Sequence, residues 1–238
     1  MIDNNKNTHN KSPFRGLGGY IPNFITCLNL FSGCVAVYLA FKGNYQGAFI
    51  TILLSAVFDF FDGFAARLLK AYSPMGKELD SLADIISFGM APGAIVFSLL
   101  QATNVCEYMP YLAFLIPVFS GLRLAKFNID ERQISSFIGM PTPANAIFWA
   151  GLAFSYSGLL VQNYWVLILL TVVFSYLLVA EIPMFSLKFK NIAWKNNQLQ
   201  YIFLIVCIIL LAFLQLNAFA PIIAWYILLS VITLIFSR

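Results

Sequence analysis

The chain has 238 residues, of which 61% are hydrophobic and 10% are charged, and its formal net charge is +4. Soluble domains contain about 45–50% apolar and about 25% charged residues, so this composition excludes a soluble globular protein, a disordered chain and a nucleic-acid-binding domain. The single histidine, His9, lies in a polar segment, and the cysteines follow neither a zinc nor a disulfide spacing. The composition predicts an all-α integral membrane protein.

The hydrophobic segments predict eight transmembrane helices after a polar segment at 1–19, which lacks the apolar stretch of a signal peptide. Each is close to the ~20 residues that cross a hydrocarbon core of ~30 Å. They lie at 21–41, 46–69, 79–101, 108–127, 143–160, 163–182, 200–216 and 219–236. Strands are not expected, because an open sheet leaves backbone groups unpaired in lipid and these segments lack the alternation of a barrel.

Basic residues indicate the orientation of these helices. Lys42 is the only one of the 14 lysines and arginines that falls on one side of the eight-helix arrangement. The others lie in the N-terminal segment, the second, fourth and sixth connections, and at the C-terminal Arg238. Cytoplasmic loops are enriched in lysine and arginine, so both termini are predicted to lie in the cytoplasm, in a multi-pass protein of the inner cell membrane.

Two neighbouring predicted helices carry stripes of aspartate and small residues. The stripe of the second helix has the spacing i, i+3, i+4, i+7 and consists of Asp59, Asp62, Gly63 and Ala66. The stripe of the third helix has the spacing i, i+4, i+8 and consists of Gly76, Asp80 and Asp84. Because a short loop at 70–77 joins the two helices, we expect them to be antiparallel neighbours whose four carboxylates converge at the cytoplasmic end.

The convergence of four carboxylates predicts a divalent-cation site. An ionised aspartate near the membrane costs a few kcal/mol unless it is paired or binds a cation. Hard cations bind through oxygen, and without histidine or cysteine nearby the expected metal is Mg²⁺ or Mn²⁺. The small residues beside the carboxylates leave room for a flat or phosphorylated ligand. Tight helix packing would explain the glycines but not the aspartates.

The pattern Asp59-x2-Asp62-Gly63-x2-Ala66-Arg67-x8-Gly76-x3-Asp80-x3-Asp84 resembles, without a departure, the signature of the CDP-alcohol phosphotransferases. This family transfers a phosphoalcohol from a CDP-alcohol to an acceptor hydroxyl, and CMP leaves. Its common core has six transmembrane helices. The resemblance therefore implies a catalytic core at 20–182, a basic cytoplasmic loop at 183–199 and two additional helices at 200–238.

Four segments resemble the phosphatidylserine synthase branch of this family. They are Pro22–Gly33, Asp80–Pro92, Gly121–Asn128 and Phe137–Ala144. Phosphatidylglycerophosphate synthases usually have proline after the third aspartate and lysine after the fourth, where this chain has Ser81 and Ile85. The resemblance implies CDP-diacylglycerol and L-serine as substrates.

The resemblance also implies roles for the acidic residues. Asp59, Asp62 and Asp80 would hold two divalent cations on the pyrophosphate of CDP-diacylglycerol. Asp84 is the candidate general base for the serine hydroxyl and also a candidate metal ligand. Direct in-line attack requires no covalent nucleophile.

Other polar residues are candidate substrate ligands, each with a structural alternative. Asn23, Thr26 and Asn29 recur every third residue and would line a cytidine pocket or bond between helices. Arg67 would pair with a phosphate or an aspartate. Arg123 or Lys126 would bind the acceptor carboxylate or a lipid phosphate, or would anchor its helix by snorkelling.

The remaining predictions concern the second half of the chain and the alternatives in function. Glu181 is expected to cap its helix or to pair with Lys188, and the basic loop to attract anionic headgroups. A homodimer remains open.

Glycerol phosphate, inositol phosphate or choline could replace serine as acceptor. A cation transporter is disfavoured, since transport sites normally lie near the midplane of the membrane.

Overall fold

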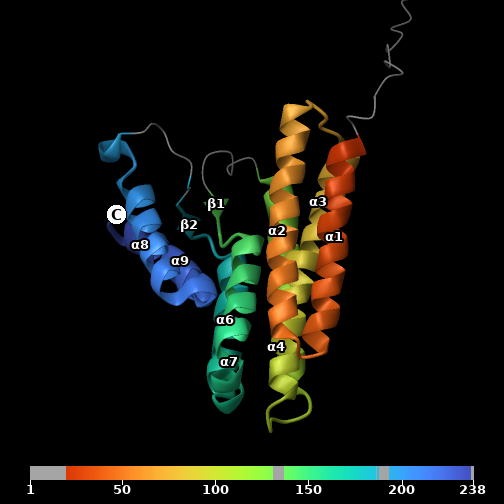
Figure 1. The fold of residues 1–238 in the computed structure, drawn as a ribbon, viewed down its shortest axis with the longest axis vertical. Coiled ribbons are helices and arrows are strands. Elements are labelled where there is room, and N and C mark those ends of the chain that lie inside the picture. The colour runs from red at the N-terminus through yellow and green to blue at the C-terminus, as the bar shows by residue number, and fades with distance from the viewer. Residues whose placement is uncertain (1–19, 131–136, 186, 188–192, 237–238) are drawn as a thin grey trace, which may run out of the picture.

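The computed structural model describes residues 20–130, 137–185, 187 and 193–236. The predicted polar segment 1–19, Arg238, and residues 186 and 188–192 of the predicted basic loop, among them Lys188, lie outside the described residues. The described chain is almost entirely helical (Figure 1). One two-residue ladder pairs β1, Phe137–Ile138, antiparallel to β2, Pro183–Met184, so the expectation of no strand is wrong there. This ladder joins two connections between helices.

The helices follow one another along the chain with short connections. The first half contains α1 (Tyr20–Phe41), α2 (Tyr45–Leu68), α3 (Pro74–Asp84), the π-helix η2 (Ile85–Met90), α4 (Ala91–Gln101), the 3₁₀-helix η3 (Met109–Phe114) and α5 (Leu115–Ile129). The second half contains α6 (Thr142–Gln162), α7 (Tyr164–Val179), the 3₁₀-helix η5 (Trp194–Asn196), α8 (Gln198–Leu214), the 3₁₀-helix η6 (Gln215–Ala218) and α9 (Phe219–Phe236).

All eight predicted membrane segments are helical. They differ in whether each helix is long enough by itself to cross a membrane. Within the described residues, six helical stretches are long and apolar enough to cross a membrane, and α7, with 16 residues, is shorter. The last stretch, Gln198–Phe236, contains both α8 and α9, which fold back on each other at Gln215, where φ is 50°. Figure 1 shows this hairpin inclined to the other helices, at the side of α6.

The third membrane segment begins earlier than its hydropathy predicts. Ser73 caps α3, because its Oγ accepts a hydrogen bond of 2.9 Å from the amide of Gly76, and Pro74 occupies the first turn. The helix therefore starts at Pro74, five residues before the predicted boundary, and takes up half of the predicted loop. The complete stretch Pro74–Gln101 has 28 residues, which exceeds the ~20 needed to cross the hydrocarbon core. Its first turns are polar, and Asp80 lies in the second of them.

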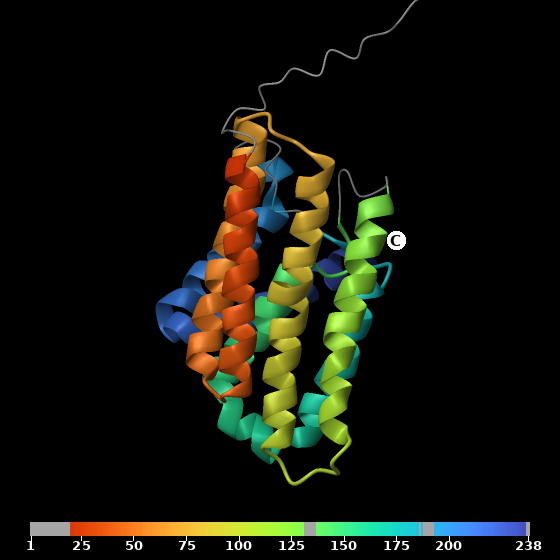
Figure 2. The ribbon, with the colours of Figure 1, turned by 90° about the vertical axis from the view of Figure 1, so that its right-hand side faces the viewer.

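The predicted neighbours α2 and α3 bring their aspartates together without packing directly against each other. Both helices contact α1, whereas α2 and α3 approach each other closely at very few points. α1 can approach η2 closely because residue 33 is a glycine. A Cβ at Gly33 would lie 2.8 Å from the Cα of Ser87 on η2. Figure 2 shows α1 and α3 side by side, with α2 behind α1. The space left between α2 and α3 becomes the site described below.

The core of the bundle surrounds α4. Ile95, Leu99 and Leu100 of this helix are fully buried, as is Trp149 on the adjoining helix α6. On its far side α6 packs against α9, where a Cβ on Gly151 would lie 3.0 Å from the backbone nitrogen of Ala220. The α8–α9 hairpin is therefore attached at the periphery, while α1 to α5 surround the acidic residues.

Candidate metal and substrate site

Three aspartates from two helices form a compact oxygen cluster. Asp59 and Asp62 come from α2, and Asp80 comes from α3. One carboxylate oxygen of each lies within 4.8 Å of those of the other two. Asp62 is buried, and the other two are half-buried. The convergence predicted from the helical spacing is confirmed for these three residues.

The cluster fits a hard divalent cation. Oδ2 of Asp62 and Oδ1 of Asp80 are shielded from solvent and have no hydrogen-bond partner within the described chain. Buried oxygen atoms without partners are costly, and a cation with oxygen ligands would satisfy them. Among the residues that the structure describes, no cysteine belongs to the cluster. These donors suit Mg²⁺ or Mn²⁺ better than zinc or copper.

Asp84 lies outside this group of three. It is buried one turn beyond Asp80, and its Oδ1 accepts a hydrogen bond of 3.3 Å from Nδ2 of Asn29 on α1. The π-helix η2 begins at the next residue, Ile85. Such single π-turns occur often at functional sites, because they re-aim the side chains before them. The structure therefore gathers three carboxylates in one cluster and holds a fourth, bonded to an amide, within electrostatic reach of it.

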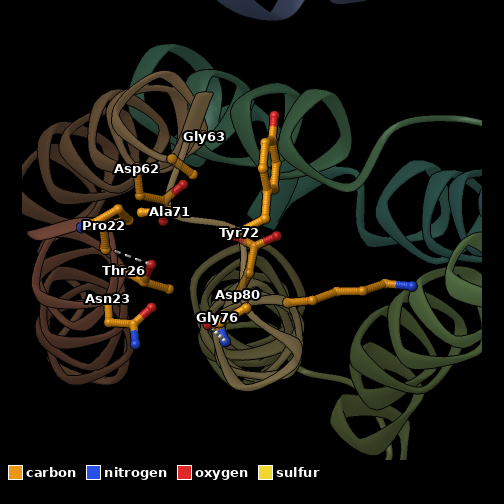
Figure 3. Close-up of a pocket in the computed structure, with 12 residues that line it drawn as sticks. Pro22, Asn23, Thr26, Asp62, Gly63, Ala71, Tyr72, Gly76 and Asp80 are labelled. Carbon is orange, nitrogen blue, oxygen red and sulfur yellow. Dashed lines mark hydrogen bonds between the residues drawn. The ribbon is translucent and has the colours of Figure 1, made fainter. Parts of the chain in front are cut away.

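A cavity of about 310 Å³ opens between α1, α2 and α3, beside the cluster (Figure 3). Its walls are Pro22, Asn23, Thr26, Asp62, Gly63, Ala66, Ala71, Tyr72, Ser73, Gly76, Lys77 and Asp80. A Cβ on Gly63 would meet no atom within 4 Å, so packing does not explain this glycine. Its missing side chain instead enlarges the cavity. Gly76 differs, because a Cβ there would lie 2.9 Å from Oδ1 of Asn23.

The predicted substrate residues divide between this cavity and its surroundings. Asn23, Thr26, Gly63, Ala66 and Gly76 line it, as the sequence predicts for a substrate pocket. By contrast, the cavity wall does not include Asn29, which bonds to Asp84. Arg67 is exposed, and no carboxylate of the described residues lies within ion-pairing distance of it. Its predicted pairing with an aspartate is therefore not formed in this structure.

The two basic candidates on α5 have different surroundings. Arg123 is 7% exposed, its guanidinium carbon lies 5.0 Å from the centre of the Phe127 ring, and its Nε has no partner in the described chain. Asp84 lies within electrostatic reach of this guanidinium. Lys126 instead forms an ion pair of 3.1 Å with Glu181. Glu181 reaches Lys126 because α5 and α7 pack together, whereas Lys188, the other partner expected for Glu181, lies outside the described residues.

Sequence reasoning missed five cavity residues, Pro22, Ala71, Tyr72, Ser73 and Lys77, of which Tyr72 and Lys77 have the longest side chains. Lys77 precedes Asp80 by three residues and therefore shares its helix face, a signal that an earlier helix start would have revealed. Tyr72 lies in the connection between α2 and α3, where periodicity carries no information. It reaches the cavity only because α2 and α3 stand apart.

Comparisons with known proteins define the family. The family model described as CDP-alcohol phosphatidyltransferase matches residues 19–177, and the chain belongs to this family. The match covers α1 to most of α7 and ends before β2, α8 and α9.

Relatives of the chain have names that agree with one another. A CDP-diacylglycerol–serine O-phosphatidyltransferase of Bacillus subtilis is 37% identical over 167 residues, which cover 68% of this chain and 88% of that protein. The protein of that name from Saccharomyces cerevisiae is 39% identical over 174 residues, covering 65% and 60%. An archaetidylserine synthase of Methanothermobacter thermautotrophicus is 35% identical over 130 residues, covering 53% and 54%.

Proposed function

We propose that this protein transfers the phosphatidyl group of CDP-diacylglycerol to the hydroxyl of L-serine, giving phosphatidylserine and CMP in phospholipid synthesis. The observation that carries the proposal is the division of the acidic residues. Asp59, Asp62 and Asp80 gather beside a cavity, whereas Asp84 lies deeper, bonded to Asn29. Membership of the family and the names of the relatives support the same reaction.

The cavity between α1, α2 and α3 supports binding of the CDP group. Gly63 and Ala66 leave the α2 wall flat, and Asn23 and Thr26 offer polar atoms on the α1 wall. Asp59, Asp62 and Asp80 would hold divalent cations at its edge, and two such cations fit the family. When bound, they would neutralise charge on the pyrophosphate and on the departing CMP.

Asp84 supports the proton transfer. In the proposed reaction the serine hydroxyl loses its proton to the Asp84 carboxylate, while its oxygen bonds to phosphorus and the phosphorus–oxygen bond to CMP breaks. Asn29 donates to one oxygen of Asp84, and this bond restricts the rotation of the carboxylate. A positioned base of this kind contributes typically 10²–10⁴-fold to the rate.

Arg123 is the better candidate ligand for the serine carboxylate. Its buried Nε lacks a partner in the described chain, and Asp84 lies within electrostatic reach of its guanidinium. Arginine forms strong bidentate bonds with carboxylates. Lys126 is occupied by Glu181, and both side chains of that pair are substantially exposed, at 37% and 68%. We therefore assign the acceptor carboxylate to Arg123 and a surface role to Lys126.

The described basic residues support a cytoplasmic site in the inner membrane. Arg67, Lys70 and Lys77 lie at the end of the bundle where α2 ends and α3 begins, close to the cavity. Lys42 lies at the opposite end, between α1 and α2. Basic residues concentrate on the cytoplasmic side, so the acidic cluster would face the cytoplasm. Reporter fusions after Cys106 and at the C-terminus test this, and an extracytoplasmic C-terminus would contradict it.

The decisive experiment compares acceptors. Purified protein is given CDP-diacylglycerol, Mg²⁺ or Mn²⁺, and separately L-serine, glycerol 3-phosphate, inositol phosphate or choline, and CMP release is followed. We expect turnover with serine and little with the others, and Asp80→Asn serves as the inactive control. Activity with glycerol 3-phosphate alone would contradict serine as the acceptor. Cation transport without CMP release would contradict the enzyme.

A further inference from the structure

The first part of α3 carries two site residues but is lightly packed. Between Pro74 and Asp84, only Ala83 and Asp84 are buried. The π-helix η2 follows at once, so the regular helical hydrogen bonding of α3 does not continue unchanged into the buried helix α4. On one side α3 packs against α1. Beyond Asp84, η2 packs closely against α5, whereas α3 itself approaches α5 only through side-chain contacts near its middle.

A polar link joins α3 to the last turns of α5. Nδ2 of Asn128 donates a hydrogen bond of 2.8 Å to Oγ of Ser81, and Nζ of Lys77 donates one of 3.1 Å to the backbone oxygen of Asn128. Ser81 in turn donates 3.3 Å to the backbone oxygen of Lys77. Figure 2 shows the two helices running side by side on one face of the molecule. The Asn128 amide and the Ser81 hydroxyl thus bridge two helices whose backbones scarcely meet.

The link connects the two halves of the proposed site. Ser81 directly follows Asp80, and Asp84 lies one turn beyond. Asn128 is five residues beyond Arg123 on α5, or about 7.5 Å along the helix axis. Both partners also belong to segments that distinguish the serine-type sequence pattern. Ser81 replaces the proline of the phosphatidylglycerophosphate pattern, and proline would offer no hydroxyl to Asn128.

We propose that Asn128, through Ser81, is a positioning residue that sets the spacing between Arg123 on α5 and Asp84 on α3. This proposal rests on the proposed function, in which Arg123 binds the acceptor carboxylate and Asp84 takes the hydroxyl proton. Serine is small, so both of its ends must be held at once, and a shift of about 1 Å costs much of the rate. The hydrogen bond between Asn128 and Ser81 restricts the movement of α5 relative to α3.

The geometry predicts that loss of the hydrogen bond between Asn128 and Ser81 weakens binding of the acceptor serine but not binding of CDP-diacylglycerol. Every residue that lines the cavity belongs to α1, α2, α3 or the connection between α2 and α3, and none belongs to α5. Loosening α5 against α3 should therefore leave the CDP cavity intact. A general structural role for Asn128 would instead weaken donor and acceptor binding together.

The test is the KM of each substrate for Asn128→Ala. We expect the KM for serine to rise about threefold to tenfold, as for the loss of one hydrogen bond, and the KM for CDP-diacylglycerol to stay within about twofold. The bond from Lys77 to the backbone oxygen of Asn128 survives this change, so the amide is tested alone. Ser98→Ala is the matched control, because it removes the interhelical contact of 3.2 Å with the Tyr45 hydroxyl at the other end of the bundle.

Two further variants keep the proposal falsifiable if Asn128→Ala folds poorly. Ser81→Ala should raise the KM for serine similarly, and the double variant should be no worse than either single one, because both remove the same bond. The exchange Ser81→Asn with Asn128→Ser should recover part of the loss. Equal changes in both KM values, or strictly additive effects, would overturn the proposal. If the unmodified protein showed no turnover with serine, the proposed function would be contradicted instead. The KM values of the variants would then be compared with the acceptor that the protein does use.

Discussion

Asn29 on α1 and Asp84 at the end of α3 are 55 residues apart in the chain, and their side chains meet in a buried hydrogen bond of 3.3 Å. The backbone oxygen of Asn29 accepts two further bonds, from the hydroxyl of Ser55 on α2 at 3.2 Å and of Ser87 on η2 at 3.1 Å. Three helical segments therefore converge on one residue. This arrangement fixes the amide that holds the proposed general base.

Replacing Asn29 by alanine should lower turnover while sparing the donor. Without the amide, the buried Asp84 loses a hydrogen bond, and bonds to charged groups contribute about 1.5–3 kcal/mol. We expect kcat to fall roughly 10-fold to 100-fold. CDP-lipid binding should change little, because Asn29 does not line the cavity. Asn163→Ala is the control, because Asn163 lies just after α6 and its amide donates a hydrogen bond to the backbone oxygen of Leu159 in the last turn of that helix. Unchanged turnover in Asn29→Ala would separate Asn29 from the chemistry.

The variants Asp80→Asn and Asp84→Asn should fail in different ways. Asp80 belongs to the oxygen cluster, so its amide variant should lose metal-dependent binding of a CDP-lipid together with turnover. Asp84 lies outside that cluster, so Asp84→Asn should bind the donor and lose about 10²–10⁴-fold in rate. The measurement is metal-dependent binding of a CDP-lipid to each variant, beside CMP release with serine. Equal loss of donor binding in both would make Asp84 a metal ligand first.

Filling the cavity from Gly63 should block the donor without unfolding the protein. No atom lies within 4 Å of a Cβ built at Gly63, so Gly63→Leu should extend into the cavity and leave the thermal midpoint nearly unchanged. We expect donor affinity to fall at least about tenfold, since the side chain occupies ligand space. Gly158→Leu is the matched control, because Gly158 on α6 is equally unobstructed and lies away from the cavity. Normal donor binding by Gly63→Leu would place the CDP group elsewhere.

The two basic residues of α5 should respond differently to substitution. Arg123→Lys keeps the charge but loses the planar donor pair, so the KM for serine should rise about tenfold or more. Lys126→Ala removes an exposed ion pair with Glu181, which is worth about 0–1 kcal/mol, and should leave that KM within about threefold. Titrating serine against each variant at saturating donor measures both. A larger effect at Lys126 would reverse the assignment of the carboxylate ligand.

The positions of most helices could be predicted from the hydrophobic runs of the sequence, for one physical reason. A helix in lipid satisfies its own backbone, so the existence of each helical segment could be predicted from local composition. The ends were harder to predict, because capping overrides hydropathy there. Ser73 and Pro74 begin α3 five residues before its apolar stretch starts. The turn at Gln215 that separates α8 from α9, by contrast, agrees with the predicted break between 200–216 and 219–236.

The candidate site was predictable where its residues share helix faces. The spacing of Asp59 and Asp62 brings both carboxylates to one side of α2, and the spacing of Asp80 and Asp84 does the same on α3. The spacing does not reveal which of the four would stand apart. That depends on Asn29, whose partner lies 55 residues away, and on the turn geometry of η2. Likewise, the burial of Arg123 and the pairing of Lys126 depend on helices remote in sequence.

The sequence alone determined that this is a helical membrane protein and that aspartates of two neighbouring helices converge. Both conclusions rest on periodicity within single helices and on the cost of charge near lipid. Only the tertiary structure decided that α1, and not direct contact between α2 and α3, supports the cluster, and that a cavity therefore opens between those two helices. The physical reason is that the approach of two helices depends on the side chains between them. Here Gly33 lets α1 come within contact of η2, while Gly63 leaves its side of α2 unfilled.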